Sequence, residues 1–228
     1  MMQAINFLLF ASKFTKHFTN NSDKIMLLNV VIDSRKIQSG NDTLFVALDG
    51  SRNAGWEFAS DAYEKGVRNF ILPVNSPSSL IKGLENSNIL LSPSPLKDLQ
   101  QLAQLNRENF KGPVIGITGS NGKTIVKEWL AQVLSAKYNL WKNPKSYNSQ
   151  IGVALSALGI SQQHQVALLE AGISAPDEMD ALTQIIQPQL GIFTNIGSAH
   201  DEHFKDTKAK IEEKCALFQG AKFLIYRK

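Results

Sequence analysis

Apolar residues in the first third of the chain fall in short runs separated by polar turns. Runs of four or five mostly apolar residues, rich in Val, Ile, Leu and Phe, are typical of buried strands. A segment of helical character, Phe58–Lys65, lies between the second and third runs, and Gly66 follows it as a helix C-terminal signal. The order strand, strand, helix, strand predicts a small α/β domain, with its strands at 28–32, 44–48 and 69–72.

The rest of the chain alternates between apolar runs and segments with apolar residues at helical spacing. This alternation is typical of a parallel sheet whose strands are joined by right-handed helical crossovers. The expected strands are 114–118, 166–169, 190–194 and 223–226, and the expected helices are 96–105, about 123–137, one beginning near Pro176, and about 207–218. The sequence therefore predicts an α/β fold in which a parallel-sheet domain follows the smaller domain.

A Ser-Pro-Ser-Pro stretch, Ser92–Pro95, separates the two patterns and is the clearest linker in the chain. We place the domain boundary there, with a first domain at 1–93 and a second at 94–228. The chain stops just after the last expected strand, where a parallel nucleotide-binding sheet rarely ends. We therefore expect an incomplete second domain and a chain that is a fragment of a longer polypeptide.

Composition narrows the class of protein. The chain is 43% hydrophobic and 19% charged, enough for a core, and its single cysteine, Cys215, fits a reducing compartment. The net charge of +4 is spread without a Lys/Arg run, which argues against a nucleic-acid groove. The apolar run Ile5–Ala11 is too short to span a bilayer, so we expect a buried helix there and a soluble, cytoplasmic protein without membrane insertion. We interpret the three tryptophans as packing residues: Trp56, Trp129 and Trp141.

The strongest chemical signal is a glycine-rich loop between the strand 114–118 and the next helix. It reads Gly119-Ser120-Asn121-Gly122-Lys123-Thr124, a short phosphate loop, with Ile117 where longer forms have another glycine. Glycines let backbone N–H groups approach phosphates, and the helix N-terminus adds a positive dipole end. Lys123 places a cation near the transferred phosphate, and Thr124 offers a hydroxyl to Mg²⁺. The alternative interpretation is a glycine turn that merely starts a helix.

Four segments in sequence order resemble the Mur ligases of peptidoglycan synthesis: the loop 118–124, an Asn-rich segment at 147–152, an acidic strand end at 169–172, and an Asn/His segment at 194–200. The segment 33–66 is similar to the uridine-nucleotide-binding domain shared by the ligases that add the third residue and those that add the final dipeptide. The forms of the second and fourth segments look more like the dipeptide-adding branch. In some bacteria that branch is fused to an alanine racemase, and the resemblance allows such an origin here.

The resemblance implies a two-step reaction. ATP phosphorylates the carboxylate of a UDP-N-acetylmuramoyl-peptide, D-alanyl-D-alanine attacks the acyl phosphate, and phosphate leaves. It also implies that residues 119–124 and Asn195 bind ATP, and that Lys123, His200 and Lys214 are catalytic. Two Mg²⁺ sites are implied, with ligands from Thr124, Glu170, His200 and Lys214. Family members carry a third, C-terminal domain that binds the incoming amine, and no segment of this sequence corresponds to it.

The residue types support these metal-binding roles unequally. Glu170 ends a buried apolar run, and a carboxylate at the end of a parallel strand opens onto the ligand crevice; a solvated strand-end acid is the alternative. Histidine is an unusual ligand for Mg²⁺, and by residue type alone the run His200–His203 is a candidate transition-metal cluster. The family usually has an apolar residue where Asp201 stands, so a surface loop is an alternative for Asp201 and His203.

Lys214 is the residue that the resemblance implies to be carbamylated, because it begins a five-residue stretch that ends in an aromatic, as in the family. Carbamylation requires a neutral amine, and therefore a pKa lowered by burial or by nearby cations. The spacing of Ile211, Cys215 and Phe218 predicts the buried face of this helix, with Lys214 beside it. Lys210 is the rival position, and an ordinary surface lysine is the alternative.

The resemblance also implies substrate-binding residues in both domains. Asn148, Ser149 and Gln150 would contact the sugar-peptide substrate, although a helix N-cap is an alternative role for this segment. Ser34 and Arg35 would meet the uracil or the diphosphate, and Arg52 is a weaker candidate for the same role.

Three other functions remain open from the sequence. The first is a Mur ligase that adds the third residue. The second is an unrelated phosphate-loop kinase or NTPase, which would have no reason to contain the segment 33–66. The third is a non-catalytic module that binds a UDP-sugar or a nucleotide.

Overall fold

The structure is a computed structural model that describes residues 5–6, 17–18, 26–198 and 201–227. The chain divides into two compact units between Leu99 and Gln100, inside helix α4 (Pro95–Asn109), and each unit is described by itself. The boundary placed between 93 and 94 stays a prediction. Within the described ranges, every helix is too short or too polar to cross a membrane.

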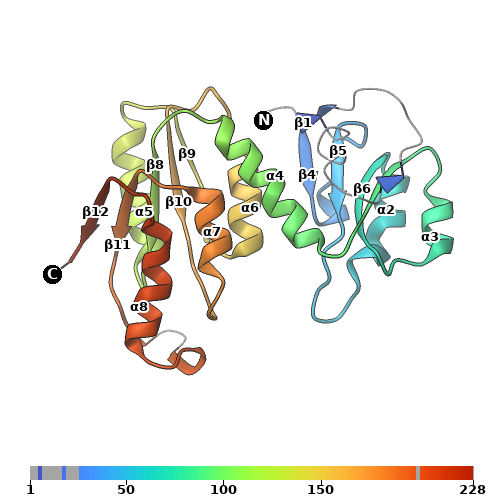
Figure 1. The fold of residues 1–228 in the computed structure, drawn as a ribbon. Helices are drawn as coiled ribbons and strands as arrows, with labels where there is room; N and C mark the ends of the chain where they lie inside the picture. The colour runs from blue at the N-terminus through green and yellow to red at the C-terminus, as the bar shows by residue number, and fades with distance from the viewer. Residues whose placement is uncertain (1–4, 7–16, 19–25, 199–200, 228) are drawn as a thin grey trace. The chain divides into compact units, whose positions relative to one another are not determined.

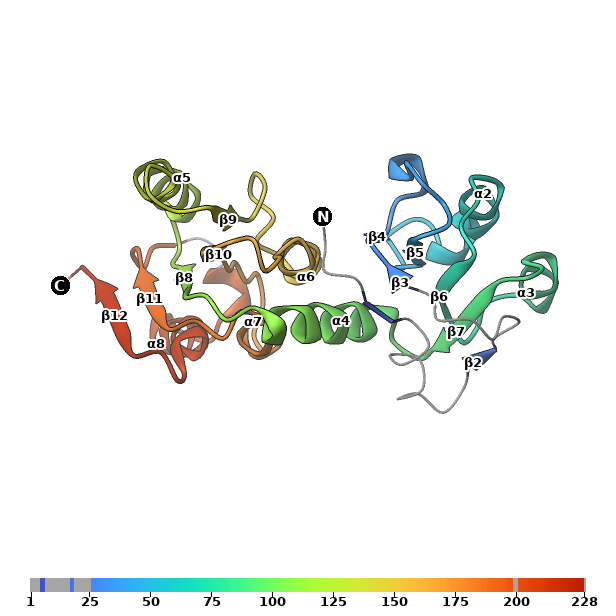
Figure 2. The same cartoon turned by 90° about the horizontal axis from the view of Figure 1, so that it is seen from above.

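The first unit contains a five-stranded sheet with the order β2-β7-β6-β5-β4 (Figure 1). The strands are β2 (His17–Phe18), β4 (Asn29–Val31), β5 (Thr43–Val46), β6 (Asn69–Pro73) and β7 (Asn88–Ser92). Strands β4 to β7 are parallel, and β2 pairs antiparallel with β7. Helices α2 (Ala59–Glu64) and α3 (Ser78–Gly83) lie on one side of the sheet (Figure 2). The unit has the expected order of elements and adds β2, α3 and β7 to it.

The helix expected over Ile5–Ala11 is wrong where the structure describes it. Ile5–Asn6 form strand β1, which pairs antiparallel with β3 (Met26–Leu27), and residues 7–11 lie outside the described residues. A pairing between segments so far apart in sequence leaves no periodicity in a local apolar run, so the run alone could not reveal it.

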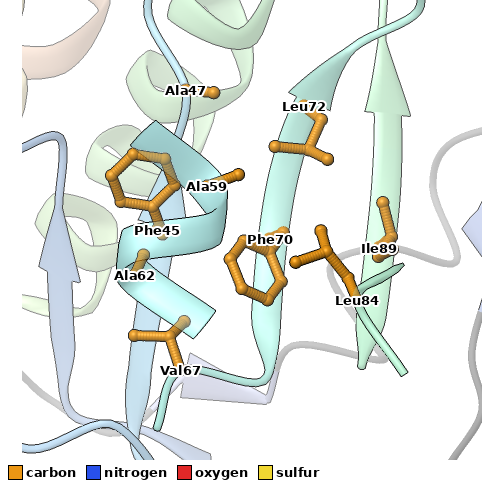
Figure 3. Packing of buried hydrophobic residues seen from close by; sticks show 9 residues of the cluster. All are labelled: Phe45, Ala47, Ala59, Ala62, Val67, Phe70, Leu72, Leu84 and Ile89. Carbon is orange, nitrogen blue, oxygen red and sulfur yellow. The ribbon is translucent and has the colours of Figure 1, made fainter. Parts of the chain in front are cut away.

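Apolar side chains that alternate along β5, β6 and β7 form a core between the sheet and its two helices (Figure 3). Phe45 and Phe70 meet edge to face with ring centroids 6.3 Å apart, and burial of each ring contributes about 1.5–3 kcal/mol. The buried members of this core are Phe45, Ala47, Ala59, Ala62, Val67, Phe70, Leu72, Leu84 and Ile89. The core holds the sheet whose edge strand β4 ends shortly before Ser34 and Arg35.

The second unit contains a five-stranded parallel sheet with the order β12-β11-β8-β10-β9. Its strands are β8 (Val114–Thr118), β9 (Leu140–Lys142), β10 (Val166–Glu170), β11 (Leu190–Phe193) and β12 (Phe223–Tyr226). Its helices after α4 are α5 (Lys123–Ser135), α6 (Gln150–Leu158), α7 (Met179–Ile186) and α8 (Thr207–Cys215). Helix α5 covers one face of the sheet, and α7 and α8 lie on the other (Figure 2). The parallel sheet with helical crossovers is confirmed, and β9 and α6 are additions to the predicted elements.

Two sequence predictions about packing are wrong. The buried face of α8 carries Lys210 and Lys214, and the short 3-10 helix Ala216–Phe218 continues it with Leu217, whereas Ile211 is 37% exposed. Lysine stems can line a buried face when their ammonium groups reach polar partners, and an apolar count assigns them to the surface. Trp129 is 69% exposed on α5 and is not a packing residue, whereas Trp141 is half-buried.

Candidate functional site

Three loops of the second unit meet because their strands are parallel and in register. Phe193 of β11 pairs with Thr118 of β8, and Glu170 of β10 pairs with Ile117. The carboxyl ends of these three neighbouring strands therefore lie at one edge of the sheet, which is the usual place for ligands in such folds. The phosphate loop, the Glu170 carboxylate and the 194–198 segment come together there.

The phosphate loop has a backbone that only glycine permits at one position. Gly119 has φ +144°, and a Cβ at this position would lie 2.1 Å from the hydroxyl oxygen of Thr194. Gly122 is left-handed, with φ +76°, and is the N-cap of α5, so that the helix starts directly at Lys123. The expected strand–loop–helix arrangement is present.

Asn195 holds this loop in place. Its carbonyl accepts the backbone N–H of Ser120 at 2.8 Å, and its side-chain oxygen accepts the backbone N–H of Asn121 at 3.0 Å. The Ser120 hydroxyl also donates to the carbonyl of Gly197 at 3.2 Å. These contacts give Asn195 a structural link to the loop that the resemblance did not specify.

Lys123 folds back onto its own loop. Its Nζ donates to the carbonyls of Gly119 and Ser120 at 2.8 and 3.0 Å. Burial lowers the pKa of Lys123, and the nearby negative charge of Glu170 opposes this shift. An ammonium held at the mouth of a phosphate loop can move to an anionic ligand without leaving the loop.

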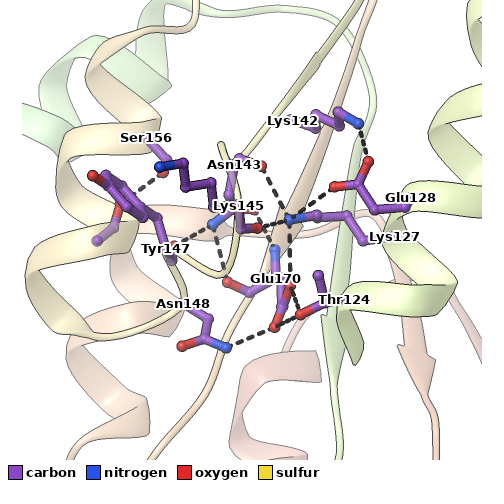
Figure 4. Close-up of polar contacts among 11 residues, drawn as sticks. Thr124, Lys127, Glu128, Lys142, Asn143, Lys145, Tyr147, Asn148, Ser156 and Glu170 are labelled. Carbon is purple, nitrogen blue, oxygen red and sulfur yellow. Dashed lines mark hydrogen bonds and ion pairs between the residues drawn. The ribbon is translucent and has the colours of Figure 1, made fainter. Parts of the chain in front are cut away.

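Glu170 is fully buried, so the alternative of a solvated strand-end acid is wrong. The Thr124 hydroxyl lies 3.0 Å from both carboxylate oxygens, and the Asn148 side chain donates to Oε1 at 2.6 Å (Figure 4). The structure thus brings together three predicted residues from separate segments. A buried carboxylate next to a hydroxyl is a hard oxygen donor set.

The sequence did not indicate two residues of this cluster, Lys127 and Asn143, which are both fully buried. The Asn143 side chain accepts the backbone N–H of Glu170 at 2.6 Å, and Lys127 Nζ lies 3.4 Å from Glu170 Oε2. Lys127 follows Thr124 by three residues, a spacing that puts both on one face of a helix and could have indicated it. Asn143 follows β9, which was not predicted.

The two candidate lysines of α8 both point inward, so an ordinary surface position is wrong for Lys214. Lys214 is 2% exposed, and burial, followed by repulsion from Lys123 and Lys210, lowers its pKa to about 8. Lys210 is fully buried, and its Nζ donates to the carbonyl of Gly197 at 2.5 Å. The lowered pKa of Lys214 is the property that carbamylation needs.

The histidine part of the prediction lies mostly outside the described residues. His200 is not described, and neither is the side chain of Asp201. Glu202 and His203 form an exposed pair, with oxygen and nitrogen 3.6 Å apart. Within the described ranges, no group of three or more His, Cys, Asp or Glu side chains is placed to hold a metal, and the predicted cluster at 200–203 lies partly outside those ranges.

Two cavities open side by side at the edge of the sheet, and both are lined by Lys123 and Asn148. The first lies against the phosphate loop, Thr124 and Glu170. The second is lined by the remaining predicted substrate residues and by polar groups of the next segment: Ser149, Gln150, Gly172, Ile173, Ser174 and Glu178. Ser149 is also the N-cap of α6, since its hydroxyl accepts the Gly152 N–H at 3.3 Å.

In the first unit, Ser34 and Arg35 begin a 3-10 helix (Ser34–Lys36) two residues after β4. Asp33 and Arg35 form a two-bonded pair, with both N···O distances 2.9 Å, and this hydrogen bonding lowers the pKa of Asp33 to about 2. A cavity of about 660 Å³ lies here, lined by Ile32, Asp33, Ser34, Arg35, Lys36, Asn53, Phe58 and Asp61. Ser34 is buried and Arg35 is exposed, so the guanidinium is available to a ligand. Arg52 is exposed and does not line this cavity.

Comparison with known proteins identifies the family. Residues 117–226 match the family described as the Mur ligase middle domain. The chain belongs to the Mur ligase family. It is 38% identical over 191 residues to a UDP-N-acetylmuramoyl-tripeptide–D-alanyl-D-alanine ligase of Borreliella burgdorferi, a match that covers 82% of this chain and 41% of the relative.

Two solved structures of Mur ligases are similar to this chain. A MurF of Acinetobacter baumannii superimposes with a TM-score of 0.84 at 24% identity, over 96% of this chain and 47% of that one, which shows the fold alone. The MurF ligase of Thermotoga maritima in complex with ADP has a TM-score of 0.76 and 30% identity, over 87% of this chain and 45% of that one. The chain thus spans less than half the length of these relatives.

The residues at the phosphate-loop site are of the types that bind a divalent cation such as Mg²⁺. Mg²⁺ prefers oxygen ligands and is usually held in proteins by one or two carboxylates together with substrate phosphates. The Glu170 carboxylate and the Thr124 hydroxyl supply such oxygens next to the cavity at the phosphate loop.

Proposed function

We propose that this chain acts in an ATP-dependent Mur ligase that joins D-alanyl-D-alanine to a UDP-N-acetylmuramoyl-tripeptide. The observation that carries the proposal is the meeting of Lys123, Thr124 and the buried Glu170 at the carboxyl edge of the sheet. The relatives support the choice of substrate, since the Borreliella burgdorferi protein bears this activity in its name and the Thermotoga maritima ligase was solved with ADP.

The two adjoining cavities match the two reactants of the first step. ATP would place its terminal phosphate against the phosphate loop, and the carboxylate of the muramoyl-peptide would enter the neighbouring cavity. A carboxylate oxygen bonds to the γ-phosphorus and ADP leaves; the amine then bonds to the carbonyl carbon, loses a proton, and phosphate leaves. Lys123 and Asn148 line both cavities and would hold the two reactants in reach of each other.

Electrostatic stabilisation is the main task of the site. Mg²⁺ on Thr124 and Glu170 would supply positive charge to the transferring phosphoryl group. Lys123 would exchange its bonds to the loop carbonyls for the phosphate. We further propose that Lys214 is carbamylated in preference to Lys210 and completes a second Mg²⁺ site together with His200.

The first unit would bind the uridine part of the substrate. Arg35 would exchange part of its pairing with Asp33 for the diphosphate, and buried Ser34 would line the uracil pocket. A guanidinium binds phosphate oxygens with two parallel bonds, as it binds Asp33 here.

Calorimetric titration of Mg²⁺ and a non-hydrolysable ATP analogue tests the proposal. Lys123→Ala should weaken binding by at least about tenfold, which corresponds to about 1.4 kcal/mol. Lys137→Ala is the matched control, since this exposed lysine lies beyond the far end of α5. If the Lys123 variant bound the ATP analogue as tightly as the wild type, the proposal would be contradicted and a non-catalytic binding module would be favoured.

The identity of the two substrates is tested in the protein expressed from its complete reading frame. Phosphate release should require both the muramoyl-tripeptide and D-alanyl-D-alanine. Release that instead depends on a diamino acid and a muramoyl-dipeptide would identify the ligase that adds the third residue. Absence of UDP-sugar binding would favour an unrelated kinase.

A further inference from the structure

Lys127 is a fully buried lysine one helical turn after Thr124 in α5. A buried ammonium is costly unless hydrogen bonds and opposite charges surround it. A methionine or leucine would fill the same space without that cost. The cation at this position therefore calls for a reason beyond packing.

The partners of Lys127 come from three separate segments (Figure 4). Its Nζ donates to the carbonyl of Asn143 at 3.1 Å and also to the carbonyl of Lys145. It lies 3.4 Å from Glu170 Oε2 and 3.4 Å from Glu128 Oε1. Both carbonyls belong to the 143–148 loop, so the ammonium joins this loop to α5 and to the end of β10.

The 143–148 loop depends on such anchors because it lies in neither a helix nor a strand. Lys145 adopts a left-handed backbone, with φ +50°, which is uncommon for a residue with a side chain. The Asn143 side chain provides the second anchor, since its Nδ2 donates to the carbonyl of Tyr147 at 2.7 Å and to that of Glu170 at 3.1 Å.

The loop ends at Asn148, which reaches the site. Asn148 donates to Glu170 Oε1 at 2.6 Å, and its carbonyl accepts the Gly172 N–H at 2.8 Å. Lys127 and Asn148 thus approach opposite oxygens of one carboxylate, Oε2 and Oε1. The same Asn148 lines both cavities of the site.

We propose that Lys127 is a positioning residue, whose buried ammonium holds the 143–148 loop and the Glu170 carboxylate against α5 and thereby keeps Asn148 between the two reactants. This inference rests on the proposed function, because Asn148 matters for catalysis only if the two cavities hold ATP and the muramoyl-peptide.

Lys127→Met tests the proposal, because it keeps the aliphatic stem and removes the ammonium. Lys142→Met is the matched control, since Lys142 pairs with Glu128 in the same cluster but is 38% exposed. Lys127→Gln is a second variant that keeps a donor for the two carbonyls but carries no charge.

Hydrogen exchange of backbone amides measures how firmly Lys127 holds the 143–148 loop, without any assumption about activity. Lys127→Met should speed exchange at Tyr147, Asn148 and Gly172 by at least about tenfold, while β8 amides stay as in the wild type. Lys142→Met should change none of these. Unchanged exchange at the three amides in Lys127→Met would overturn the proposal. If neither Lys127 variant folds, fast exchange of these amides in the wild type would overturn it instead, and strong protection would support it.

Steady-state kinetics of the protein from its complete reading frame tests the consequence for catalysis. Lys127→Met should lower kcat by about tenfold or more and raise KM for the muramoyl-peptide, with KM for ATP changed less than about threefold. In an Asn148→Ala background the same substitution should have a much smaller effect, because the two residues act through one carboxylate. A smaller amount of folded protein would lower the apparent kcat and leave both KM values unchanged. That result would therefore count against a positioning role for Lys127. A wild type without ligase activity would refute the proposed function but leave the exchange result valid.

Discussion

At the scale of single residues, the second unit carries several charged side chains that are almost completely buried. Glu170, Lys127, Lys210 and Lys214 are all at most 2% exposed, although such side chains are rarely buried. Glu170 and Lys127, 3.4 Å apart, restrict each other, because an unpaired charge in the interior is far more costly than a paired one. The cluster therefore orients functional groups more strictly than a solvated site would.

Lys214 should form a carbamate at a pH well below that needed by an ordinary lysine. Its pKa of about 8 leaves about a tenth of the amine neutral at about pH 7 and about nine tenths at about pH 9. At constant dissolved ¹³CO₂, the carbamate signal in ¹³C NMR should therefore appear at a lower pH than the signal of an ordinary lysine, because carbamate forms only from the neutral amine. Lys214→Met should abolish the signal, whereas Lys208→Met, at an 85% exposed lysine, should not. A signal that persists in Lys214→Met and disappears in Lys210→Met would assign the modification to the rival position.

At the scale of elements, the helices were predicted better than the faces they bury. The expected helix over 207–218 corresponds to α8 and the 3-10 turn that follows it, and Asp206 caps it by accepting the Ala209 N–H at 2.8 Å. Its buried face is nevertheless shifted by one residue, from the apolar positions to the lysines. Apolar spacing locates a buried face only where apolar contacts alone decide it, and at this site polar contacts decide it.

Trp141 and Trp129 should differ strongly in their effect on stability. The Trp141 indole N–H donates to the Ser156 carbonyl at 2.8 Å, and its ring packs so close to Gly159 that a Cβ there would lie 2.1 Å away. It joins β9 to α6. We expect Trp141→Ala to reduce the free energy of unfolding in urea by about 2–4 kcal/mol, and Trp129→Ala to change it by less than about 0.5 kcal/mol. Equal losses in the two variants would contradict the packing described here.

At the scale of the whole molecule, the two units carry separate candidate sites. The cavity at Ser34 and Arg35 lies in the first unit, and the phosphate loop lies in the second. Each sheet has its own order of strands, so each site is assembled from residues of its own unit. Binding to the two sites can therefore be perturbed independently.

Arg35→Ala should weaken UDP binding by about tenfold and leave the affinity for ADP within about twofold, and Lys123→Ala should do the reverse. The double variant should show each loss unchanged, one for UDP and one for ADP, because the substituted residues lie in separate units. Fluorescence or calorimetric titration of each variant with each nucleotide measures this. Loss of ADP binding in Arg35→Ala would show that the two sites are not independent.

The sequence by itself determined the strands that frame the site, the phosphate loop, and the family to which the loop and three other segments point. These features are local, because a glycine loop after a buried strand reports its chemistry through neighbouring residues. Only the tertiary structure decided which polar groups meet. Lys127 and Asn143 reach Glu170 from elements whose pairing is long-range, and β1, β9 and α6 leave too little periodicity for detection. Burial of a charge depends on partners far away in sequence, so Lys214 could be suspected from its motif, but its environment could come only from the fold.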